Sequence, residues 1–342
     1  MMRIDFSEIY NYPGVPVIDV RTPAEFANGH IPGALNIPIF SDDERALIGT
    51  RYHQAGKDAG FMLGLEVIGP KLSYFVKKLN SIVAAHSPLI LYCWRGGMRS
   101  NSMGWLFEQA GHEVMVINGG YKAYRSYIRE HICHGWDFRV IGGLTGSGKT
   151  ITLQHLSLLG EQVIDLEAIA SHKGSVFGHL GQSAQPCNEE FENTLWEAIR
   201  QMDPCRPIFV EDESRSIGKV SLPEPFYIRL QLSPLYLLEV SFDDRVNRIV
   251  HEYGCFPKED IIGNILKINK YIGSENCNKA VQMVLNDDLK SAAGLLLKYY
   301  DKKYREAITA YGQREMTVIK GSSKDCNNNA KLIQQLSSVN QN

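Results

Sequence analysis

Two short glycine-containing segments of the sequence have residue types that bind anions. The first, LYCWRGGMRS (91–100), places a cysteine before two glycines and an arginine. The second, VIGGLTGSGKT (140–150), ends in lysine and threonine. Backbone N–H groups of a tight turn, together with a nearby cation, can surround an anion. The sequence therefore indicates two anion-binding loops, of which only the first contains a thiol.

The first loop has the features of a reactive cysteine. Cys93 ends an apolar run, PLILYC (88–93), that is typical of a buried strand, and a helix should begin near Ser100. Backbone N–H groups and cations favour the thiolate, which is the reactive form of cysteine. The two glycines allow the tight curve. We predict the catalytic residues Cys93, Arg95 and Arg99, and the cradle residues Trp94, Gly96, Gly97 and Met98.

Such a cysteine would attack a tetrahedral oxyanion or carry a group taken from one. The alternative is a buried structural cysteine, because free cysteines are usually small apolar core residues. The spacing C-x5-R-S is also that of cysteine phosphatases, although Tyr92 stands where those enzymes usually have histidine. Phosphate chemistry therefore remains an alternative for this loop taken alone.

The second loop satisfies G-x4-G-K-T between an apolar strand and a helical run, ITLQHLSLLG (151–160). This is the context of a P-loop, in which N–H groups surround one phosphate, the lysine reaches another and the threonine hydroxyl binds Mg²⁺. The motif specifies a di- or triphosphate, and it implies neither a nucleotide nor hydrolysis. The predicted diphosphate-binding residues are Gly143, Gly146, Ser147, Gly148, Lys149 and Thr150.

An acidic segment follows further along the chain. PIFVEDESRSIG (207–218) is an apolar run that delivers Glu211, Asp212 and Glu213 to a strand end. One of these carboxylates could hold Mg²⁺ directly or through water, and the alternative is a solvated acidic loop. The predicted magnesium ligands are Thr150, Glu211 and Asp212.

Strands and helices alternate in both halves of the chain, which predicts α/β domains with parallel sheets. The segment VIDVRTPAEFANGHIPGALNIP (17–38) resembles the N-terminal signature of rhodaneses, and this likeness covers about 125 residues. Thr22, Pro23 and Glu25 form a helix-capping pattern within it, and His30 is interpreted as a turn residue. We expect a rhodanese-like domain over 1–125, a linker helix over 126–136, a P-loop NTPase-like domain over 137–320 and a polar tail that forms a short frayed helix over 321–342.

Further segments resemble the tRNA 2-selenouridine synthase family: YCWRGGMRSNSM, DLEAIASHKGSVFG, QPCNEEFENTLW and VEDESRSIGKVSLP. The resemblance implies conversion of wobble (U34) 2-thiouridine in tRNA to 2-selenouridine. Selenophosphate would be the selenium donor, and S-geranyl-2-thiouridine, made from geranyl diphosphate, the intermediate. Cys93 would hold selenium as S-selanylcysteine, and the P-loop would bind the diphosphate with Mg²⁺. Candidate contacts to diphosphate or tRNA are His172, Lys173, Ser175 and Arg215.

Composition limits the alternatives. The 342 residues carry 36 Lys and Arg against 38 Asp and Glu, so any contact to tRNA needs a local basic face. The seven cysteines lack paired spacing, which favours a reducing cytoplasm, and we expect a monomer without membrane segments, supplied by a selenophosphate-producing enzyme. Two other functions stay open at this point: a sulfurtransferase fused to an ATP-dependent kinase or ATPase, and a phosphate-sensing binding protein.

Overall fold

The computed structural model describes residues 1–310, 314–322 and 325–339. The chain divides into two compact units. The first comprises Met1–Ile132 together with Glu192–Thr194, and the second comprises Cys133–Phe191 together with Leu195–Asn342. None of the helices in the described part of the chain has the length and apolarity that a membrane crossing requires.

The first unit is built on a five-stranded sheet in which every neighbouring pair is parallel. Its order is β1-β5-β4-β2-β3, so β3 lies on one side of β2 and β4 on the other. The order reverses between β2 and β4, which makes the carboxyl end of β4 a place where α/β proteins bind ligands. The strands are β1 (Met2–Ile4), β2 (Val17–Asp19), β3 (Leu35–Asn36), β4 (Leu89–Tyr92) and β5 (Val114–Ile117).

Helices cover this sheet, and all four residues of β4 are buried, as its apolar run predicts. Phe75 and Phe107 pack from two of the helices into the same core. The predicted capping pattern at Thr22 and Glu25 is confirmed as a capping box. The helices are η1 (Phe6–Asn11), α1 (Pro23–Ala27), α2 (Asp42–Ile68), η2 (Gly69–Lys71), α3 (Leu72–Asn80), α4 (Met98–Gln109) and α5 (Gly120–His131).

The second unit has a five-stranded parallel sheet of order β12-β11-β6-β8-β7. The strand that precedes the P-loop is therefore central, and the order reverses between it and β8. The strands are β6 (Phe138–Gly143), β7 (Gln162–Ile164), β8 (Ile208–Glu211), β11 (Leu235–Glu239) and β12 (Met316–Lys320). A separate antiparallel hairpin consists of β9 (Ser216–Ile217) and β10 (Val220–Ser221). The predicted α/β fold class with parallel sheets is thus confirmed in both units.

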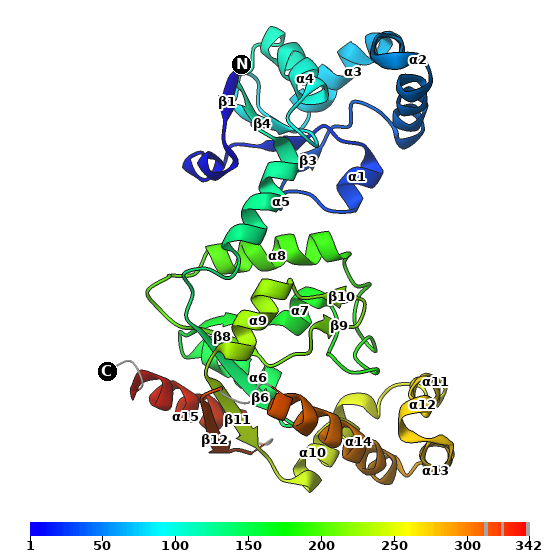
Figure 1. Ribbon diagram of the computed structural model, residues 1–342, viewed down its shortest axis with the longest axis vertical. Coiled ribbons are helices and arrows are strands. Elements are labelled where there is room, and N and C mark those ends of the chain that lie inside the picture. The colour runs from blue at the N-terminus through cyan, green and yellow to red at the C-terminus, as the bar shows by residue number, and fades with distance from the viewer. Residues whose placement is uncertain (311–313, 323–324, 340–342) are drawn as a thin grey trace. The chain divides into compact units, whose positions relative to one another are not determined.

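Residues 258–310 are mostly helical, and α10 and α14 lie side by side (Figure 1). The helices of this unit are α6 (Lys149–Leu158), α7 (Leu166–Ala170), α8 (Asn188–Arg200, whose residues 192–194 belong to the first unit), α9 (Glu224–Leu232), α10 (Phe242–Tyr253), α11 (Lys258–Lys267), α12 (Asn269–Ile272), α13 (Ser274–Leu285), α14 (Leu289–Ala310) and α15 (Cys326–Val339).

One segment differs from the organisation expected from sequence. The expectation of a short frayed helix in the tail is wrong, because α15 has 14 residues and packs on α6 with Ala330 and Ile333 fully buried. Residues 323–324 and 340–342 of that tail lie outside the described residues. The segment 126–136, predicted as a linker helix, includes the end of α5, and Ile128 and Ile132 there are fully buried.

The packing of α15 predicts an asymmetric response to truncation along the helix. Ile333→Ala should lower the free energy of unfolding by about 2–5 kcal/mol, because it removes a fully buried side chain. Leu336→Ala is the matched control, since Leu336 is 39% exposed and its loss should change stability by about 0.5 kcal/mol or less. Urea unfolding of both variants measures the difference. Equal small effects would contradict the packed helix.

Candidate functional site

Cys93 follows the carboxyl end of β4, at the start of the loop that leads into α4. Its Sγ accepts a hydrogen bond from the Gly97 N–H at 3.3 Å and lies 3.3 Å from the Ser100 hydroxyl oxygen. The thiol is 3% exposed. The loop therefore turns backbone and side-chain donors toward the sulfur, as the sequence predicts for a thiolate cradle.

The pKa of Cys93 reflects two opposing causes. Burial, the largest, raises the pKa of the thiol. Hydrogen bonds from the Ser100 hydroxyl and from backbone N–H groups lower the pKa, and the charge of Arg99 adds to them. The second set prevails, so the pKa lies below the usual value for cysteine. A lowered pKa increases the thiolate fraction at a given pH, and the thiolate is the reactive form of cysteine.

The two arginines of the loop occupy different environments. Arg99 is half-buried and forms a bidentate ion pair with Glu25, with Nη1–Oε2 and Nη2–Oε1 distances of 2.5 and 3.2 Å. This pair holds the guanidinium beside the loop and offsets part of its charge. Arg95 and Met98 are exposed and Trp94 is partly buried, so the side chains of Arg95 and Met98 face solvent around the loop.

Backbone packing from α5 fixes the floor of this loop. Gly120 has a φ of +58°, and a Cβ there would lie 2.1 Å from the carbonyl oxygen of Cys93. The next residue, Tyr121, donates its N–H to the same carbonyl at 2.9 Å. Gly96 is equally confined, since its Cβ would lie 2.4 Å from the carbonyl oxygen of Ile117. Only glycine permits this approach of two backbone segments.

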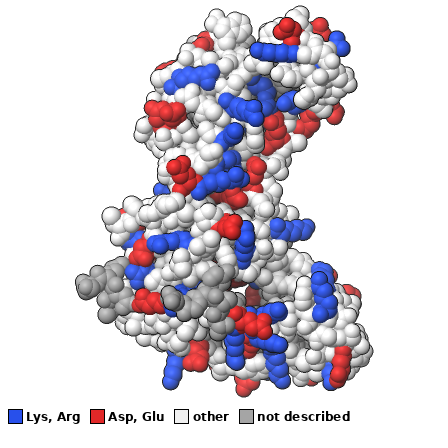
Figure 2. All heavy atoms as spheres, viewed as in Figure 1, with Lys and Arg blue, Asp and Glu red and all other residues white. Residues whose placement is uncertain are grey.

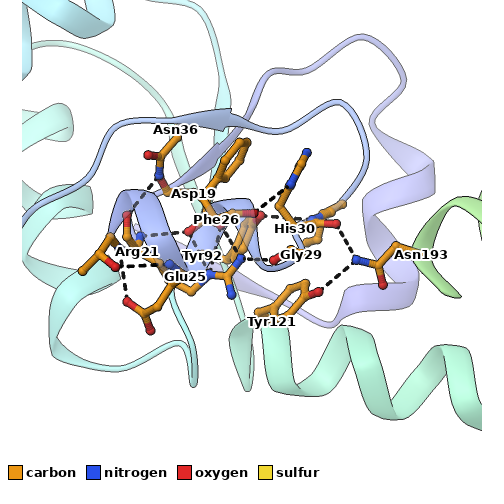
Figure 3. Close-up of polar contacts among 12 residues, drawn as sticks. Asp19, Arg21, Glu25, Phe26, Gly29, His30, Asn36, Tyr92, Tyr121 and Asn193 are labelled. Atoms are coloured by element: carbon orange, nitrogen blue, oxygen red, sulfur yellow. Dashed lines mark hydrogen bonds and ion pairs between the residues drawn. The ribbon is translucent and has the colours of Figure 1, made fainter. Parts of the chain in front are cut away.

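Polar residues of segment 17–38 form a buried support for this region (Figure 3). The Arg21 guanidinium donates to both carboxylate oxygens of Asp19 and to the Gly29 carbonyl, with Nη2 2.6 and 2.7 Å from its acceptors. The Asp19 and Arg21 side chains are almost fully buried, at 0 and 1% exposure. Removal of one partner of such a pair costs about 3–5 kcal/mol. We therefore assign them a structural role.

The turn at His30 has the same character. The ring of His30 stacks on Phe26 at a centroid distance of 3.8 Å, and its Nδ1 lies 3.1 Å from the Phe26 carbonyl oxygen. Asn193 donates to the His30 carbonyl at 2.8 Å and to the Tyr121 hydroxyl at 2.9 Å (Figure 3). The imidazole is occupied in shaping the turn, in agreement with its interpretation as a turn residue.

In the second unit, the P-loop connects β6 to α6 and lines a cleft of about 880 Å³. The Lys149 ammonium donates to the Gly143 carbonyl at 3.0 Å, and the Thr150 hydroxyl donates to Glu167 at 3.1 Å. All six predicted diphosphate-binding residues line this cleft. The loop thus presents its lysine and hydroxyl on one face, as a P-loop requires.

Several carboxylates lie near Lys149 and Thr150. Glu211 is fully buried; its Oε1 accepts the Glu167 N–H at 2.8 Å, and its Oε2 has no hydrogen-bond partner among the described residues. Burial raises the pKa of Glu167, and it raises the pKa of Glu213 to about 8, with Lys149 opposing both shifts. Each additional carboxylate disfavours the charge of the others, so the cluster has the electrostatics of a cation site.

The cluster fits Mg²⁺ better than it fits a metal bound by protein alone. No group of three or more His, Cys, Asp or Glu side chains within residues 1–310, 314–322 and 325–339 is arranged to hold a metal ion. Mg²⁺ commonly keeps several waters and takes only one or two carboxylates together with phosphate oxygens. Thr150 and Glu167, with the unpartnered Oε2 of Glu211 behind them, supply such a partial set.

Asp212 lines the same cleft but is bound to other partners. Its carboxylate accepts the Tyr304 hydroxyl at 2.8 Å and the Arg314 guanidinium at 3.2 Å. The Tyr304 hydroxyl in turn accepts the Gly143 N–H at 2.8 Å. Asp212 therefore braces the start of the P-loop through Tyr304. Of the predicted magnesium ligands, Thr150 and Asp212 line the same cleft, and the Thr150 hydroxyl donates to Glu167, which was not among them.

A buried ion pair braces the P-loop from its other side. Arg245 of α10, 3% exposed, forms a bidentate pair with Asp301 of α14 at 2.7 and 2.8 Å. The same guanidinium donates to the Thr145 carbonyl of the P-loop at 3.1 Å. Helices α10 and α14 thus hold the backbone of the P-loop in place, a role that their sequences alone do not indicate.

The four candidate contact residues are dispersed. Lys173 pairs with Glu252 at 2.5 Å, and Lys173 and Ser175 line the P-loop cleft. His172 is buried, and this burial, followed by the nearby His179, lowers its pKa. Arg215 is 55% exposed and lies 3.6 Å from Glu224. Lys173 and Ser175 are placed to meet a ligand in the cleft, whereas His172 has the environment of a core residue.

Several residues that contact the predicted site residues were not identified from the sequence, among them Ser100, Glu167 and Tyr304. Ser100 contacts the Cys93 sulfur, Glu167 accepts the Thr150 hydroxyl, and Tyr304 bridges the P-loop to Asp212. Ser100 had a local signal, because it stands in the C-x5-R-S spacing. Glu167 and Tyr304 had none, since their partners lie 17 and 92 residues away.

The aromatic and basic segment YKAYRSYIR (121–129) does not present an RNA surface as a whole. Tyr121, Tyr124 and Arg125 are buried in the first unit, so packing accounts for this pattern. On the face drawn in Figure 2, basic and acidic side chains are interspersed.

Fold and site together define a protein with a rhodanese-like domain followed by a P-loop domain. A family model of rhodanese-like domains matches residues 5–127, and a model described as the tRNA 2-selenouridine synthase AAA domain matches residues 136–290. The chain belongs to the tRNA 2-selenouridine synthase family.

Curated relatives cover between 70% and 91% of the chain. A tRNA 2-selenouridine synthase of Pseudomonas putida is 34% identical over 91% of this chain and 92% of its own. One of Shewanella loihica is 35% identical over 86% of this chain and 87% of its own. One of Bdellovibrio bacteriovorus is 41% identical over 70% of this chain and 64% of its own. Both domains are thus shared with the relatives.

The donors around Cys93 predict a measurable shift in its reactivity. Ser100→Ala should raise the pKa of the thiol, because the hydroxyl favours the thiolate. The pH at which iodoacetamide alkylation reaches half its maximal rate should move upward, with slower reaction at pH 7. Peptide-resolved mass spectrometry separates Cys93 from the six other cysteines. Ser102→Ala, an exposed serine on the same helix, should leave the profile unchanged; equal profiles for both variants would contradict the assignment.

The contact between Gly120 and Cys93 predicts a steric effect beyond ordinary backbone strain. Gly120→Ala should lower the melting temperature and disturb the alkylation profile of Cys93, because the new Cβ overlaps a carbonyl oxygen. Gly14→Ala is the matched control: its φ is +79°, yet no atom lies within 4 Å of its Cβ. It should show only the roughly 1–2 kcal/mol cost of a positive φ. Indistinguishable variants would show that the close approach is unimportant.

Proposed function

We propose that this protein converts the wobble 2-thiouridine of tRNA to 2-selenouridine, with selenophosphate as selenium donor and S-geranyl-2-thiouridine, formed from geranyl diphosphate, as intermediate. Family membership supports the overall conversion. The division into two steps is supported by one observation: the chain has two separate anion loops, one with a low-pKa cysteine and one with a P-loop lysine.

The P-loop unit serves geranyl transfer. The sulfur of 2-thiouridine attacks the first carbon of the geranyl chain, a carbon–sulfur bond forms, and the carbon–oxygen bond to diphosphate breaks. The base loses its N3 proton, and diphosphate leaves. Lys149 and the loop N–H groups stabilise the charge that develops on the leaving oxygen. Thr150 and Glu167 would hold Mg²⁺, which supplies further neutralisation of the diphosphate.

The rhodanese-like unit serves selenium transfer. Cys93 receives selenium from selenophosphate, whose tetrahedral anion fits a loop of backbone N–H groups flanked by Arg95 and Arg99. In this step the sulfur–selenium bond forms, water cleaves the selenium–phosphorus bond to release phosphate, and a small-molecule disulfide accepts the two electrons and becomes two thiols. The carrier's selenium then attacks C2 of the modified base: a carbon–selenium bond forms, the carbon–sulfur bond breaks, and geranyl thiolate leaves. Two thiols finally reduce the sulfur–selenium bond, which frees 2-selenouridine and the Cys93 thiol and regenerates the disulfide. Prior geranylation matters because it turns the 2-thio group into a leaving group.

Loss of the thiol should block only the second step. Cys93→Ser should still form S-geranyl-2-thiouridine and accumulate it, with no detectable 2-selenouridine, because serine is neither a thiolate nor a selenium carrier at neutral pH. Chromatography of tRNA nucleosides after reaction measures both products. Cys205→Ser, which changes an exposed cysteine, should behave as wild type. Wild-type levels of 2-selenouridine in Cys93→Ser would refute the carrier.

Loss of the P-loop lysine should block the first step instead. Lys149→Ala should slow geranylation by about 10²–10³-fold, the usual effect of removing one donor to a developing anion. The variant should still selenate tRNA that already carries S-geranyl-2-thiouridine. Lys331→Ala, an exposed lysine of α15, serves as the control. If Lys149→Ala and Cys93→Ser accumulate the same nucleoside, the two loops do not divide the reaction in this way.

A further inference from the structure

An apolar cavity lies next to the P-loop cleft within the second unit. Its volume is about 70 Å³, and its walls are almost entirely hydrocarbon, contributed largely by α10, α11 and α14. Ile265, Leu296 and Leu297 are among the lining residues and are less than 9% exposed. A pocket of this composition offers nothing to a sugar or a base, whose polar groups would lose water without gaining partners.

The cavity and the cleft share part of their walls. Five residues line both: Thr145, Ser175, Ile249, Tyr253 and Tyr300. Thr145 belongs to the P-loop itself, and Arg245 holds its carbonyl at 3.1 Å. A ligand whose charged head lies on the P-loop would therefore have an apolar space directly beside it.

We infer that this cavity binds the far end of the hydrocarbon tail of a prenyl diphosphate whose head group lies on the P-loop. The inference rests on the proposed function and adds the part of the chain that recognises the tail. A diphosphate cradle that adjoins a hydrocarbon pocket matches an amphiphile. The same arrangement disfavours a nucleoside triphosphate, because a ribose and base are polar where this pocket is apolar.

Cavity size limits how much of the tail enters. A cavity of about 150 Å³ accommodates benzene, which has six carbons. The cavity here is about 70 Å³, so it accepts a few carbons, about one isoprene unit at most. The carbons nearer the diphosphate then lie in the larger cleft, along Ile249 and Tyr253. The pocket would thus measure tail length: a five-carbon tail falls short of it, and a fifteen-carbon tail exceeds it.

Calorimetric binding of a ligand series to the full chain, with Mg²⁺ present, tests this inference. The probes are pyrophosphate and the dimethylallyl, geranyl and farnesyl diphosphates. Each buried methylene contributes about fourfold in affinity. Geranyl diphosphate should therefore bind at least tenfold more tightly than pyrophosphate, and more tightly than the dimethylallyl ester.

Two variants of α14 alter the cavity in opposite directions. Ala293→Leu fills it and should reduce geranyl diphosphate affinity about tenfold or more, while pyrophosphate affinity stays the same. Leu296→Ala enlarges it and should shift preference toward farnesyl diphosphate. The two do not depend on each other, so misfolding of the filled variant leaves the enlarged one decisive. Leu266→Ala, which changes a residue that is 54% exposed on α11, should alter neither affinity.

The outcomes separate this inference from the function on which it rests. If pyrophosphate and geranyl diphosphate bind the wild-type chain equally, or if Leu296→Ala and Ala293→Leu leave the tail-length preference unchanged, the cavity is not the tail site, although the P-loop still binds diphosphate. If neither ligand binds and ATP does, the proposed function fails and this inference fails with it. Geranyl preference that both variants alter in the expected directions supports it.

Discussion

Both anion loops of this protein depend on backbone N–H groups, and such groups can be aimed only by fixing the strand before the loop and the helix after it. Each loop follows a central parallel strand, β4 or β6, at the point where the strand order of its sheet reverses. There the neighbouring connections leave toward opposite faces, and a crevice opens at the carboxyl ends of the strands. The topology of each sheet therefore determines where its loop lies, independently of the side chains in the loop.

The supports of the two loops differ in kind. The Cys93 loop rests on backbone, because Gly120 brings α5 into direct contact with the Cys93 carbonyl. The P-loop rests on polar side chains: Tyr304 accepts the Gly143 N–H, and Arg245 donates to the Thr145 carbonyl. Arg245 also pairs with Asp301 in a nearly dry environment, so removing either partner would leave a buried charge and cost several kcal/mol. Both devices restrict motion of the atoms that face the anion.

Electrostatics separates the chemistry of the two loops. Donors and the charge of Arg99 overcome burial at Cys93, and the pKa of the thiol is lowered. The second unit instead gathers Glu167, Glu211 and Glu213 in a buried group, where burial raises each pKa. Burial of several ionised carboxylates together is energetically unfavourable unless cations neutralise them. A magnesium ion that accompanies a diphosphate would relieve that cost and would bring the ligand with it, whereas a thiolate carrier has no use for this arrangement.

Several features were determined by the sequence alone. The positions of both glycine-containing loops, their order and the α/β class could be predicted, because each loop is a contiguous run of about ten residues with a recognisable spacing between a strand and a helix. The capping box at Thr22 and Glu25 was predictable for the same reason, since its hydrogen bonds join residues three apart.

Only the tertiary structure decided which groups meet these loops. Glu25 reaches Arg99 across 74 residues, and Asp212 is taken by Arg314 across 102. The apolar cavity has walls from Thr145 to Tyr300. Likewise α15, polar in composition, packs through only a few apolar residues, so its burial was not evident from sequence. Local spacing records contacts within a turn or a helix, whereas contacts between distant segments depend on how the sheets and helices pack.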